Sequence, residues 1–267
     1  MYNTTMRFTL GTESDAKATN LCATVHGLRL FALDALTVVC DDDKVYMQGL
    51  DNSHVCLFEV ELHSSWFDEY DFDSKKDDAS LAISPSILDK VLGTRQTGQS
   101  ITVKQESSDS LVLQLQGGTA GNVNKVFTVP LMSVDGYERM DVPPQEYDID
   151  LTVNSKRFSS LIDQLSLFGN SATISSDSEG VNLRTSGDNG VMSARIDGLD
   201  ELMEYAIVED FVLVQRFSLR FLKIMTSFNS LCTDVYVGMG DDKPMTVQYE
   251  LGDKSRVQFF MAPQVGE

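Results

Sequence analysis

A weak internal repeat constrains the fold of this chain more than any other feature. The two copies run over residues 84–115 and 218–249, and each has a helical pattern followed by two strand patterns with a turn between them. A repeat of this kind predicts a duplicated supersecondary unit. We therefore expect two similar α+β domains, at residues 1–132 and 145–267. A connector at 133–144 is expected to join them, because Asp, Gly and two prolines interrupt the periodicity there.

Most of the other segments have the composition and partial alternation of β-strands. Residues 36–40 and 44–48 flank Asp41-Asp42-Asp43, a pattern that predicts a hairpin. Residues 101–104 and 111–115 flank a second polar turn and predict another hairpin. Further strands are expected at 55–62, 121–131, 172–175, 180–184 and 190–197.

Four short segments have helical periodicity. The clearest is 84–93, with Ser84 as N-cap, Pro85 in the first turn and Gly93 after the last turn. Its apolar residues 87, 88, 91 and 92 form one stripe. The helix expected between about 15 and 26 has Leu21, Cys22 and Val25 facing inward. A second expected helix has an inward stripe of Phe158, Leu161, Ile162, Leu165 and Phe168. A third begins after Ser218, with Leu219, Leu222 and Met225 facing inward.

The composition is that of a globular chain without a membrane span. Apolar residues make up 42% of the 267 positions, and charged residues 23%. No apolar run reaches the length of a membrane-spanning helix, and the first seven residues lack the apolar region of a secretion signal. The cysteines are far apart and form no C-x-x-C motif, so we expect free buried thiols in a reducing compartment. They are Cys22, Cys40, Cys56 and Cys232.

The formal net charge of −19 argues against nucleic-acid binding unless the basic residues gather on one face. On the expected last helix, Arg220, Lys223 and Ser227 lie at i, i+3 and i+7, opposite the apolar stripe. Lys90 is expected to point outward from its helix. Lys17, Asn20 and Thr24 are expected to share a polar face on the first helix. The polar faces of these helices lack acids except Asp15 and Asp89, although the chain is rich in acids. From spacing alone, an ordinary solvated helix face is the favoured interpretation.

Three short motifs, far apart in the chain, give a more specific signal. They are Leu50-Asp51-Asn52-Ser53-His54-Val55, Val142-Pro143-Pro144-Gln145-Glu146-Tyr147 and the C-terminal run Gln258-Phe259-Phe260-Met261-Ala262-Pro263-Gln264-Val265. In this order and at these separations the chain resembles the eukaryotic and viral DNA sliding clamps of the proliferating cell nuclear antigen family. That family typically reads L/M-D-S-S-H-V, I-P-E-Q-E-Y and a tail ending Y-L-A-P-K. The resemblance covers nearly the whole chain and is weak over the first forty residues.

The resemblance implies an α+β DNA-clamp fold with two similar domains per chain, antiparallel sheets outside and helices inside a ring. It further implies a homotrimer that encircles duplex DNA without reading its sequence and acts as a DNA polymerase processivity factor. The expected partners are DNA polymerase, clamp loader, flap nuclease and ligase, each carrying a short apolar and aromatic peptide motif. No cofactor and no catalysis are expected. The expected location is the nucleus, or a viral replication compartment if the chain is viral.

The resemblance also assigns residues. It implies DNA-facing residues at Lys17, Lys90, Lys156, Arg157, Arg220 and Lys223. It implies a partner-peptide groove at Leu50, His54, Val55, Met140, Val142, Pro143, Pro244, Phe260, Ala262 and Pro263. It implies subunit interfaces on the strands at 121–131 and 190–197, with Val126, Phe127, Val129, Val191, Met192 and Ala194.

Two sites depart from the family's usual pattern. Where the family carries basic residues on the first helix of the second domain, this chain has Ser160, Asp163 and Leu167, which predicts a weakly basic channel. Ser178 stands where the family has a modifiable lysine.

An enzymatic interpretation has little support in the residues. The histidines His26, His54 and His63 have no metal-ligand spacing with the cysteines. Asp41–Asp43 fits a turn, and the acidic run from Asp68 to Asp73 fits a solvated loop better than a cation site. The chain has no phosphate-binding loop and no nucleophile motif. Two alternatives remain open: an acidic interaction scaffold of clamp fold that does not encircle DNA, and a hydrolase using the Asp68–Asp73 acids.

Overall fold

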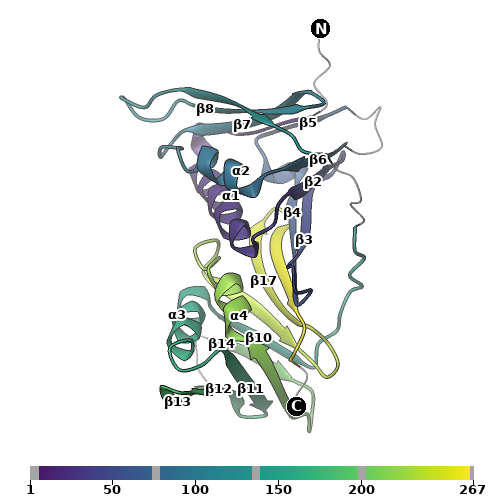
Figure 1. Cartoon of the computed structure of the whole chain (residues 1–267), viewed down its shortest axis with the longest axis vertical. Coiled ribbons are helices and arrows are strands. Elements are labelled where there is room, and N and C mark those ends of the chain that lie inside the picture. The colour runs from purple at the N-terminus through teal and green to yellow at the C-terminus, as the bar shows by residue number, and fades with distance from the viewer. Residues whose placement is uncertain (1–5, 74–78, 134–138, 198–202, 265–267) are drawn as a thin grey trace. The chain divides into compact units, whose positions relative to one another are not determined.

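A computed structural model describes residues 6–73, 79–133, 139–197 and 203–264. Residues 134–138 of the expected connector and Val265 of the C-terminal motif lie outside this range. The chain forms two compact units (Figure 1). Unit 1 comprises Met1–Asp51, Glu59–Met140 and Leu251–Val257, and unit 2 comprises Asn52–Phe58, Asp141–Glu250 and Gln258–Glu267.

Unit 1 contains two antiparallel sheets and two α-helices. The first sheet has the order β5-β1-β7-β8-β9, and in the second β6, β2, β3 and β4 are successive neighbours. The first sheet consists of β1 (Met6–Leu10), β5 (Glu69–Phe72), β7 (Ser100–Ser107), β8 (Ser110–Gln116) and β9 (Lys125–Pro130). The remaining strands and helices are β2 (Leu36–Cys40), β3 (Lys44–Leu50), β4 (Cys56–His63), β6 (Ala79–Ile83), α1 (Asp15–Leu28) and α2 (Pro85–Leu92), with 3₁₀ turns at Thr12–Ser14, Arg29–Phe31 and Ser64–Trp66.

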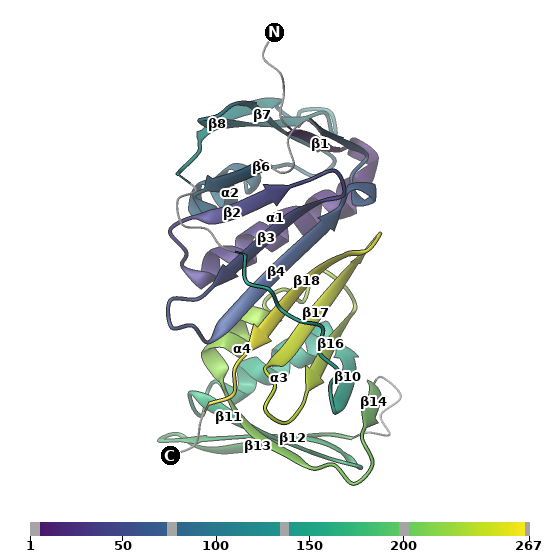
Figure 2. The same ribbon diagram turned by 90° about the vertical axis from the view of Figure 1, so that its right-hand side faces the viewer.

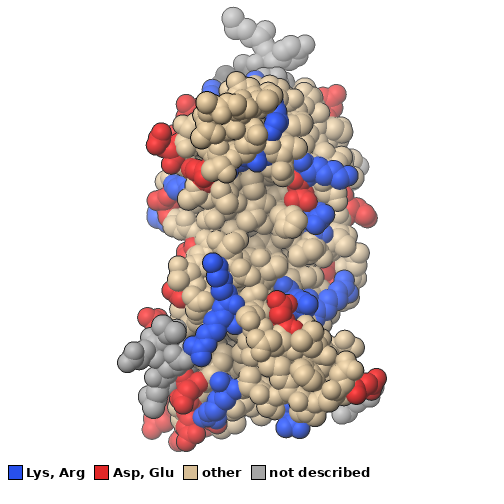
Figure 3. All heavy atoms as spheres, turned by 90° about the vertical axis from the view of Figure 1, so that its left-hand side faces the viewer, with Lys and Arg blue, Asp and Glu red and all other residues tan. Residues whose placement is uncertain are grey.

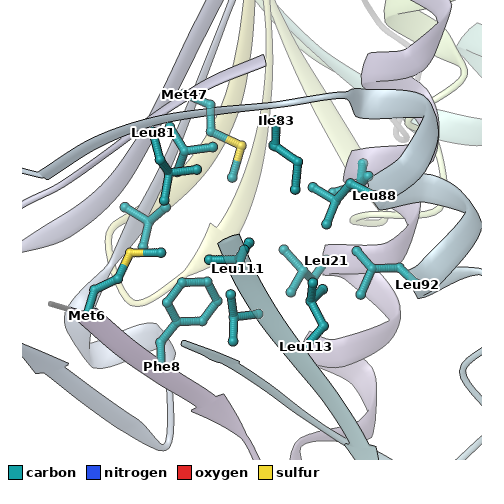
Figure 4. A pocket seen from close by; sticks show the side chains of 14 residues that line it. Met6, Phe8, Leu21, Met47, Leu81, Ile83, Leu88, Leu92, Leu111 and Leu113 are labelled. Carbon is teal, nitrogen blue, oxygen red and sulfur yellow. The ribbon is translucent and has the colours of Figure 1, made fainter. Parts of the chain in front are cut away.

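The core of unit 1 lies between the two helices and the sheets. Leu21 and Val25 of α1 and Leu88 of α2 are buried there, because each helix presents one apolar face. A small cavity of about 40 Å³ remains in this core, and all the side chains around it are apolar (Figure 4). A cavity of this size with no polar lining stays dry, so it is a packing defect rather than a ligand site.

Unit 2 has the same kinds of elements. One antiparallel sheet has the order β13-β12-β11-β15, and in the other β14, β10, β16, β17 and β18 are successive neighbours. The strands of the first are β11 (Ser171–Asp177), β12 (Gly180–Gly187), β13 (Gly190–Asp197) and β15 (Leu213–Ser218). The other elements are β10 (Ile149–Asn154), β14 (Met203–Ile207), β16 (Asp234–Met239), β17 (Met245–Gly252), β18 (Ser255–Met261), α3 (Ser155–Leu165) and α4 (Leu219–Thr226) (Figure 2).

An aromatic cluster forms part of the core of unit 2. The rings of Phe228 and Phe259 lie 4.9 Å apart in an edge-to-face arrangement, and Tyr249 adjoins both. The buried hydroxyl of Tyr249 donates to the carbonyl of Met225 at the end of α4, 3.0 Å away. The cluster therefore fastens α4 to the sheet while leaving no buried polar group on the tyrosine unsatisfied.

The internal repeat is visible in the two units. In unit 1, α2 is followed by the antiparallel pair β7 and β8, and in unit 2, α4 is followed by the antiparallel pair β16 and β17. The predicted α+β clamp class with two similar units is confirmed. The hairpin around Asp41 is also confirmed, since the Asp41 carboxylate accepts from the amides of Asp43 and Lys44, both at 2.8 Å. Among the described helices, none is long and apolar enough to cross a membrane.

Several local predictions were wrong. Ile87 is exposed, because Pro85 and Leu88 fill the buried side of α2 and leave Ile87 at its border. Ser84 is the N-cap residue of α2 and Pro85 is in its first turn, as predicted, but the Ser84 side chain makes no capping bond; Gly93 has φ −63°, so the helix ends without a left-handed residue. Thr24 is buried rather than on a polar face, because it lies three residues after Leu21 on the inward side of α1. The strand expected at 121–131 begins only at Lys125.

Candidate functional site

The basic side chains expected on the helices of unit 1 are partly neutralised by acids. The ammonium of Lys17 on α1 lies 2.8 Å from the Asp253 carboxylate and 6.0 Å from the ring centre of Trp66. Lys90 is exposed near the end of α2. Its neighbour Asp89 accepts from His26 at 3.0 Å and pairs with Arg29 at 3.3 Å. One carboxylate on α2 thus holds two basic groups at the end of α1.

His26 and Arg29 were missed by sequence reasoning. They lie three residues apart at the end of α1, a spacing that places them on one side of the helix. Their acidic partner comes from α2, more than fifty residues later, so no local pattern reveals the cluster. His26 lies nine residues after Lys17, so the two side chains are on opposite faces of α1.

In unit 2 the same kind of neutralisation occurs between α3 and α4. The Lys223 ammonium lies 3.4 Å from the Asp163 carboxylate, and both side chains are about half exposed. The guanidinium of Arg220 lies 5.2 Å from the ring centre of Phe221. Lys156 and Arg157 are exposed in the first turn of α3, where the Asn154 side chain accepts from the amide of Arg157 at 3.1 Å. The expected basic residues of unit 2 therefore lie on two adjoining helices.

The space-filling view from the side opposite Figure 2 shows Lys and Arg interspersed with Asp and Glu rather than one continuous basic surface (Figure 3). Exposed ion pairs add little to stability, about 0–1 kcal/mol each. Each ion pair does reduce the electrostatic attraction between its basic group and a distant phosphate. The ion pairs are consistent with the weakly basic channel expected from the residues Ser160, Asp163 and Leu167.

The strands expected at the subunit interfaces lie at sheet edges. In the described sheets, β9 is the last strand of its sheet in unit 1 and β13 is the last of its sheet in unit 2. The side chains of Val126 and Val191 are 60% and 54% exposed, whereas Phe127, Met192 and Ala194 are half-buried. Val129 is buried in the core of unit 1, so only its backbone is near the edge. Exposed apolar side chains on free strand edges are typical of strands that pair with another chain.

A depression of about 290 Å³ lies beside β13. Phe158, Leu161 and Gln164 of α3 form one side of it, and Ala194 and Ile196 of β13 form the other. Leu161 was expected to face fully inward, but it is only half-buried because it borders this depression. The edge strand and the depression together offer backbone groups and an apolar recess to an incoming strand.

The residues expected to bind a partner peptide are placed by three contacts in unit 2. The amide of Ala262 donates to the carbonyl of Val55 at 3.0 Å, which joins the first and third motifs. Lys243, next to Pro244, donates to the carbonyl of Glu146 at 2.7 Å and pairs with Asp148 at 3.1 Å. The ring of Tyr147 lies so close to Gly238 that a Cβ there would come within 2.5 Å of it. These contacts hold the second motif beside the turn that carries Pro244.

The exposure of these residues differs. Val55, Val142, Pro244 and Pro263 are half-buried, and His54, Pro143 and Ala262 are exposed. His54 has φ 57°, the left-handed conformation of a tight turn between β3 and β4. Phe260 is only 8% exposed, so most of its ring belongs to the core of unit 2. In unit 1, Leu50 is half-buried at the end of β3, and Met140 is exposed with its backbone bonded to Gln48.

The acidic and thiol groups have structural roles. Asp68 accepts from the amide of Gly11 and, at 2.8 Å, from the hydroxyl of Ser14. No group of three or more metal-ligating side chains occurs within the described residues. The cysteines are free; Cys40 and Cys56 are buried as expected, whereas Cys22 and Cys232 are only partly buried. Burial raises the pKa of Cys40 to about 12, which keeps this thiol protonated and unreactive.

Two similar α+β units, two free strand edges and basic residues on the helices define a duplicated clamp-type chain. Comparison with protein families agrees. Residues 17–139 match the model of the N-terminal domain of proliferating cell nuclear antigen, and residues 141–264 match the model of its C-terminal domain. The chain belongs to the proliferating cell nuclear antigen family, whose members are DNA sliding clamps and non-enzymatic processivity factors.

Individual relatives are distant but cover most of the chain. The proliferating cell nuclear antigen of Chaetomium thermophilum is 28% identical over 235 residues, which span 85% of this chain and 88% of that protein. Proliferating cell nuclear antigen 2 of Drosophila melanogaster is 24% identical over 232 residues, which span 86% of this chain and 89% of that protein. At this level of identity the functional side chains must be examined one by one.

Proposed function

We propose that three copies of this chain close into a ring around duplex DNA and tether replication and repair proteins to it. The observation that carries the proposal is the match of both clamp domains, in order, across nearly the whole chain. The free edges of β9 and β13 support ring closure, because head-to-tail pairing between chains covers both of these edges in every chain. The proposed domain division keeps residues 133–144 as the connector.

In the proposed ring, the helices face DNA through the six expected basic residues. A closed ring is retained on DNA by topology, so individual phosphate contacts need not be strong. Tethering raises the effective concentration of a bound polymerase at the primer end. This chemistry needs no catalytic group. The proposed location is the nucleus, or a viral replication compartment.

The proposed partners are DNA polymerase, clamp loader, flap nuclease and ligase. They would bind the expected groove residues through a peptide with a Gln, an aliphatic residue and two aromatics. Val55, Val142, Pro143, Pro244, Ala262 and Pro263 of unit 2 support this assignment, since apolar surface that is half-buried or exposed is typical of a docking site. Leu50 and Met140 of unit 1 are included by resemblance.

The ion pairs on the helices favour one alternative, an interaction scaffold of clamp fold that does not encircle DNA. The two functions differ in a loading experiment with a clamp loader. We expect the chain to be retained on nicked circular DNA and to slide off after the circle is cut, because only a topological link depends on free ends. Equal retention on circular and linear DNA, or none on either, would contradict encirclement.

Charge reversal tests the DNA-facing assignment. The double change Arg220→Glu, Lys223→Glu is expected to weaken binding to a short duplex and to flatten the salt dependence of the binding constant by about two units of slope, one for each lost phosphate contact. Trimer mass should stay the same. The measurement is a fluorescence titration of duplex DNA at several salt concentrations.

A matched control is Arg184→Glu, Arg216→Glu. Both arginines are exposed, and both lie opposite Thr173 on neighbouring strands, on the sheet face away from buried Leu183 and Phe217. The same change in net charge at this position is expected to leave the slope almost unaltered. Equal effects from both double variants would mean that only total charge matters, and the assignment to α4 would be wrong.

A further inference from the structure

A buried glutamine ties the connector to unit 1. The side chain of Gln48 on β3 is buried, with only 3% of it exposed, on the face of the strand opposite the core residues Val45 and Met47. Its Nε2 donates to the carbonyl of Met140 at 2.8 Å, and its Oε1 accepts from the amide of Met140, also at 2.8 Å. The side-chain amide therefore donates to and accepts from the backbone of Met140, as the backbone of a neighbouring β-strand would. Both polar ends of the buried amide are satisfied by this one residue.

A second layer of contacts fixes Gln48 and the residue before Met140. Glu59 on β4 accepts from the Tyr46 hydroxyl and from Gln48 Nε2, the latter at 3.1 Å. The guanidinium of Arg139 lies 4.1 Å from the centre of the Tyr46 ring. Arginine stacks on aromatic faces in this geometry. Arg139 and Met140 are thus held against β3 by a stacked ring and by two hydrogen bonds.

The choice of glutamine is informative because the sheet itself does not need it. Tyr46, which shares this face of β3 with Gln48, is also buried, and an apolar side chain at position 48 would avoid the desolvation of a buried amide. The amide can hold a backbone segment through hydrogen bonds that an apolar side chain could not make. Met140 is that segment, and it is exposed on its side-chain side, so the bonds fix its backbone while leaving its side chain free for contact.

We propose that Gln48, supported by Tyr46 and Glu59, is a positioning residue that pre-orders Arg139–Met140 for binding of the partner peptide. The inference rests on the proposed partner-peptide site, which includes Met140 and, two residues further on, Val142. If the backbone at Arg139 and Met140 is already held in place, it loses less conformational freedom when the peptide binds, so affinity rises without any contact between Gln48 and the peptide.

The test is Gln48→Leu, which keeps the apolar volume and removes both hydrogen bonds to Met140. We expect the Met140 amide to exchange with deuterium at least tenfold faster, and the dissociation constant of a synthetic partner peptide to rise about tenfold. The trimer mass should not change. The peptide is the Gln, aliphatic and double-aromatic motif described above, titrated by calorimetry, and exchange is followed by mass spectrometry.

The same unit provides a matched control in Gln99, which is also fully buried. Its Nε2 donates to the carbonyl of Val123 at 2.9 Å and its Oε1 accepts from the amide of Gln96 at 3.0 Å. Gln99→Leu makes the same chemical change away from the connector. It is expected to leave both Met140 exchange and peptide affinity as in the unaltered chain.

If Gln48→Leu does not fold, Arg139→Ser removes only an exposed stacked side chain and should weaken peptide binding about threefold.

The outcomes separate this inference from the function on which it rests. If the unaltered chain binds the peptide and Gln48→Leu binds it equally well, the positioning role is overturned even when Met140 exchanges faster. An equal loss of affinity in Gln99→Leu would also overturn it, because general loosening of unit 1 would then be the cause. If the unaltered chain binds no such peptide, the proposed partner site itself fails.

Discussion

Thr128→Pro is expected to convert the proposed trimer into monomers. The backbone of β9 alternates between its neighbour β8 and its free edge. The amide of Leu131 donates to the carbonyl of Asp109 on the β8 side, so the alternation assigns residues 127 and 129 to β8 and residues 126 and 128 to the free edge. Pro130 has no N–H and lies at a free-edge position, which agrees with this alternation of backbone groups along β9. Proline at 128 therefore removes a donor that only a second chain could use.

The size of the effect follows from the ring. One lost hydrogen bond at each interface is worth about 1 kcal/mol, and a closed trimer has three interfaces. The total of about 3 kcal/mol corresponds to roughly a hundredfold weaker assembly. The clash of the proline ring with an incoming strand adds to this. Light scattering at micromolar concentration measures the mass, with the exposed Thr128→Val as the control that keeps the N–H.

The structure changes the choice of variant for this test. Phe127 is one of the interface residues that the family resemblance implies, but the alternation directs the Phe127 amide toward β8. Phe127→Pro would disrupt the sheet of unit 1 and confuse unfolding with ring opening. A Thr128→Pro chain that keeps both its circular dichroism and its trimer mass would refute pairing through β9, as would an unaltered chain that is monomeric at micromolar concentration.

Local patterns in the sequence predicted most of the elements but few of the contacts between them. The hairpin at β2 and β3 was predictable because Asp41 can cap a turn with its own side chain. The stripe of Leu219, Leu222 and Met225 was predictable because helical spacing alone determines which face is apolar. The position of Thr24 was not, because the width of the buried face of α1 depends on what packs against it.

The candidate sites divide in the same way. The three motifs identified the expected groove residues, and the contact between Val55 and Ala262 joins two of them. The ion pairs of Asp89 with Arg29 and His26, and the bonds of Gln48 to Met140, join residues more than fifty positions apart. Nothing in local composition or periodicity encodes such pairs, since they depend on how separate elements meet.

The partner-peptide site is expected to fail when a charge is placed at its centre. Val142 is half-buried and two residues beyond Met140, and Val55 is held beside Ala262 by the backbone hydrogen bond. Val142→Glu and Val55→Glu should each weaken peptide binding by about 2 kcal/mol or more, roughly thirtyfold, because a carboxylate would have to be desolvated against an apolar ligand. Changing Asp68 or Glu69 should alter affinity little, since exposed charges outside the site act mainly on the association rate.

Phe260 is a poorer probe of the same site, although it belongs to the expected groove. Its ring is almost fully buried, so Phe260→Ala is expected to destabilise unit 2 by about 3–5 kcal/mol. Loss of binding would then report on folding as much as on contact. Val212→Glu is the better reference for the valine variants, because Val212 is 67% exposed in the same unit and the substitution is the same. Calorimetric titration of the peptide, with trimer mass checked for every variant, decides the matter. If Val55→Glu and Val142→Glu bind as tightly as Val212→Glu, the partner site lies elsewhere on the chain.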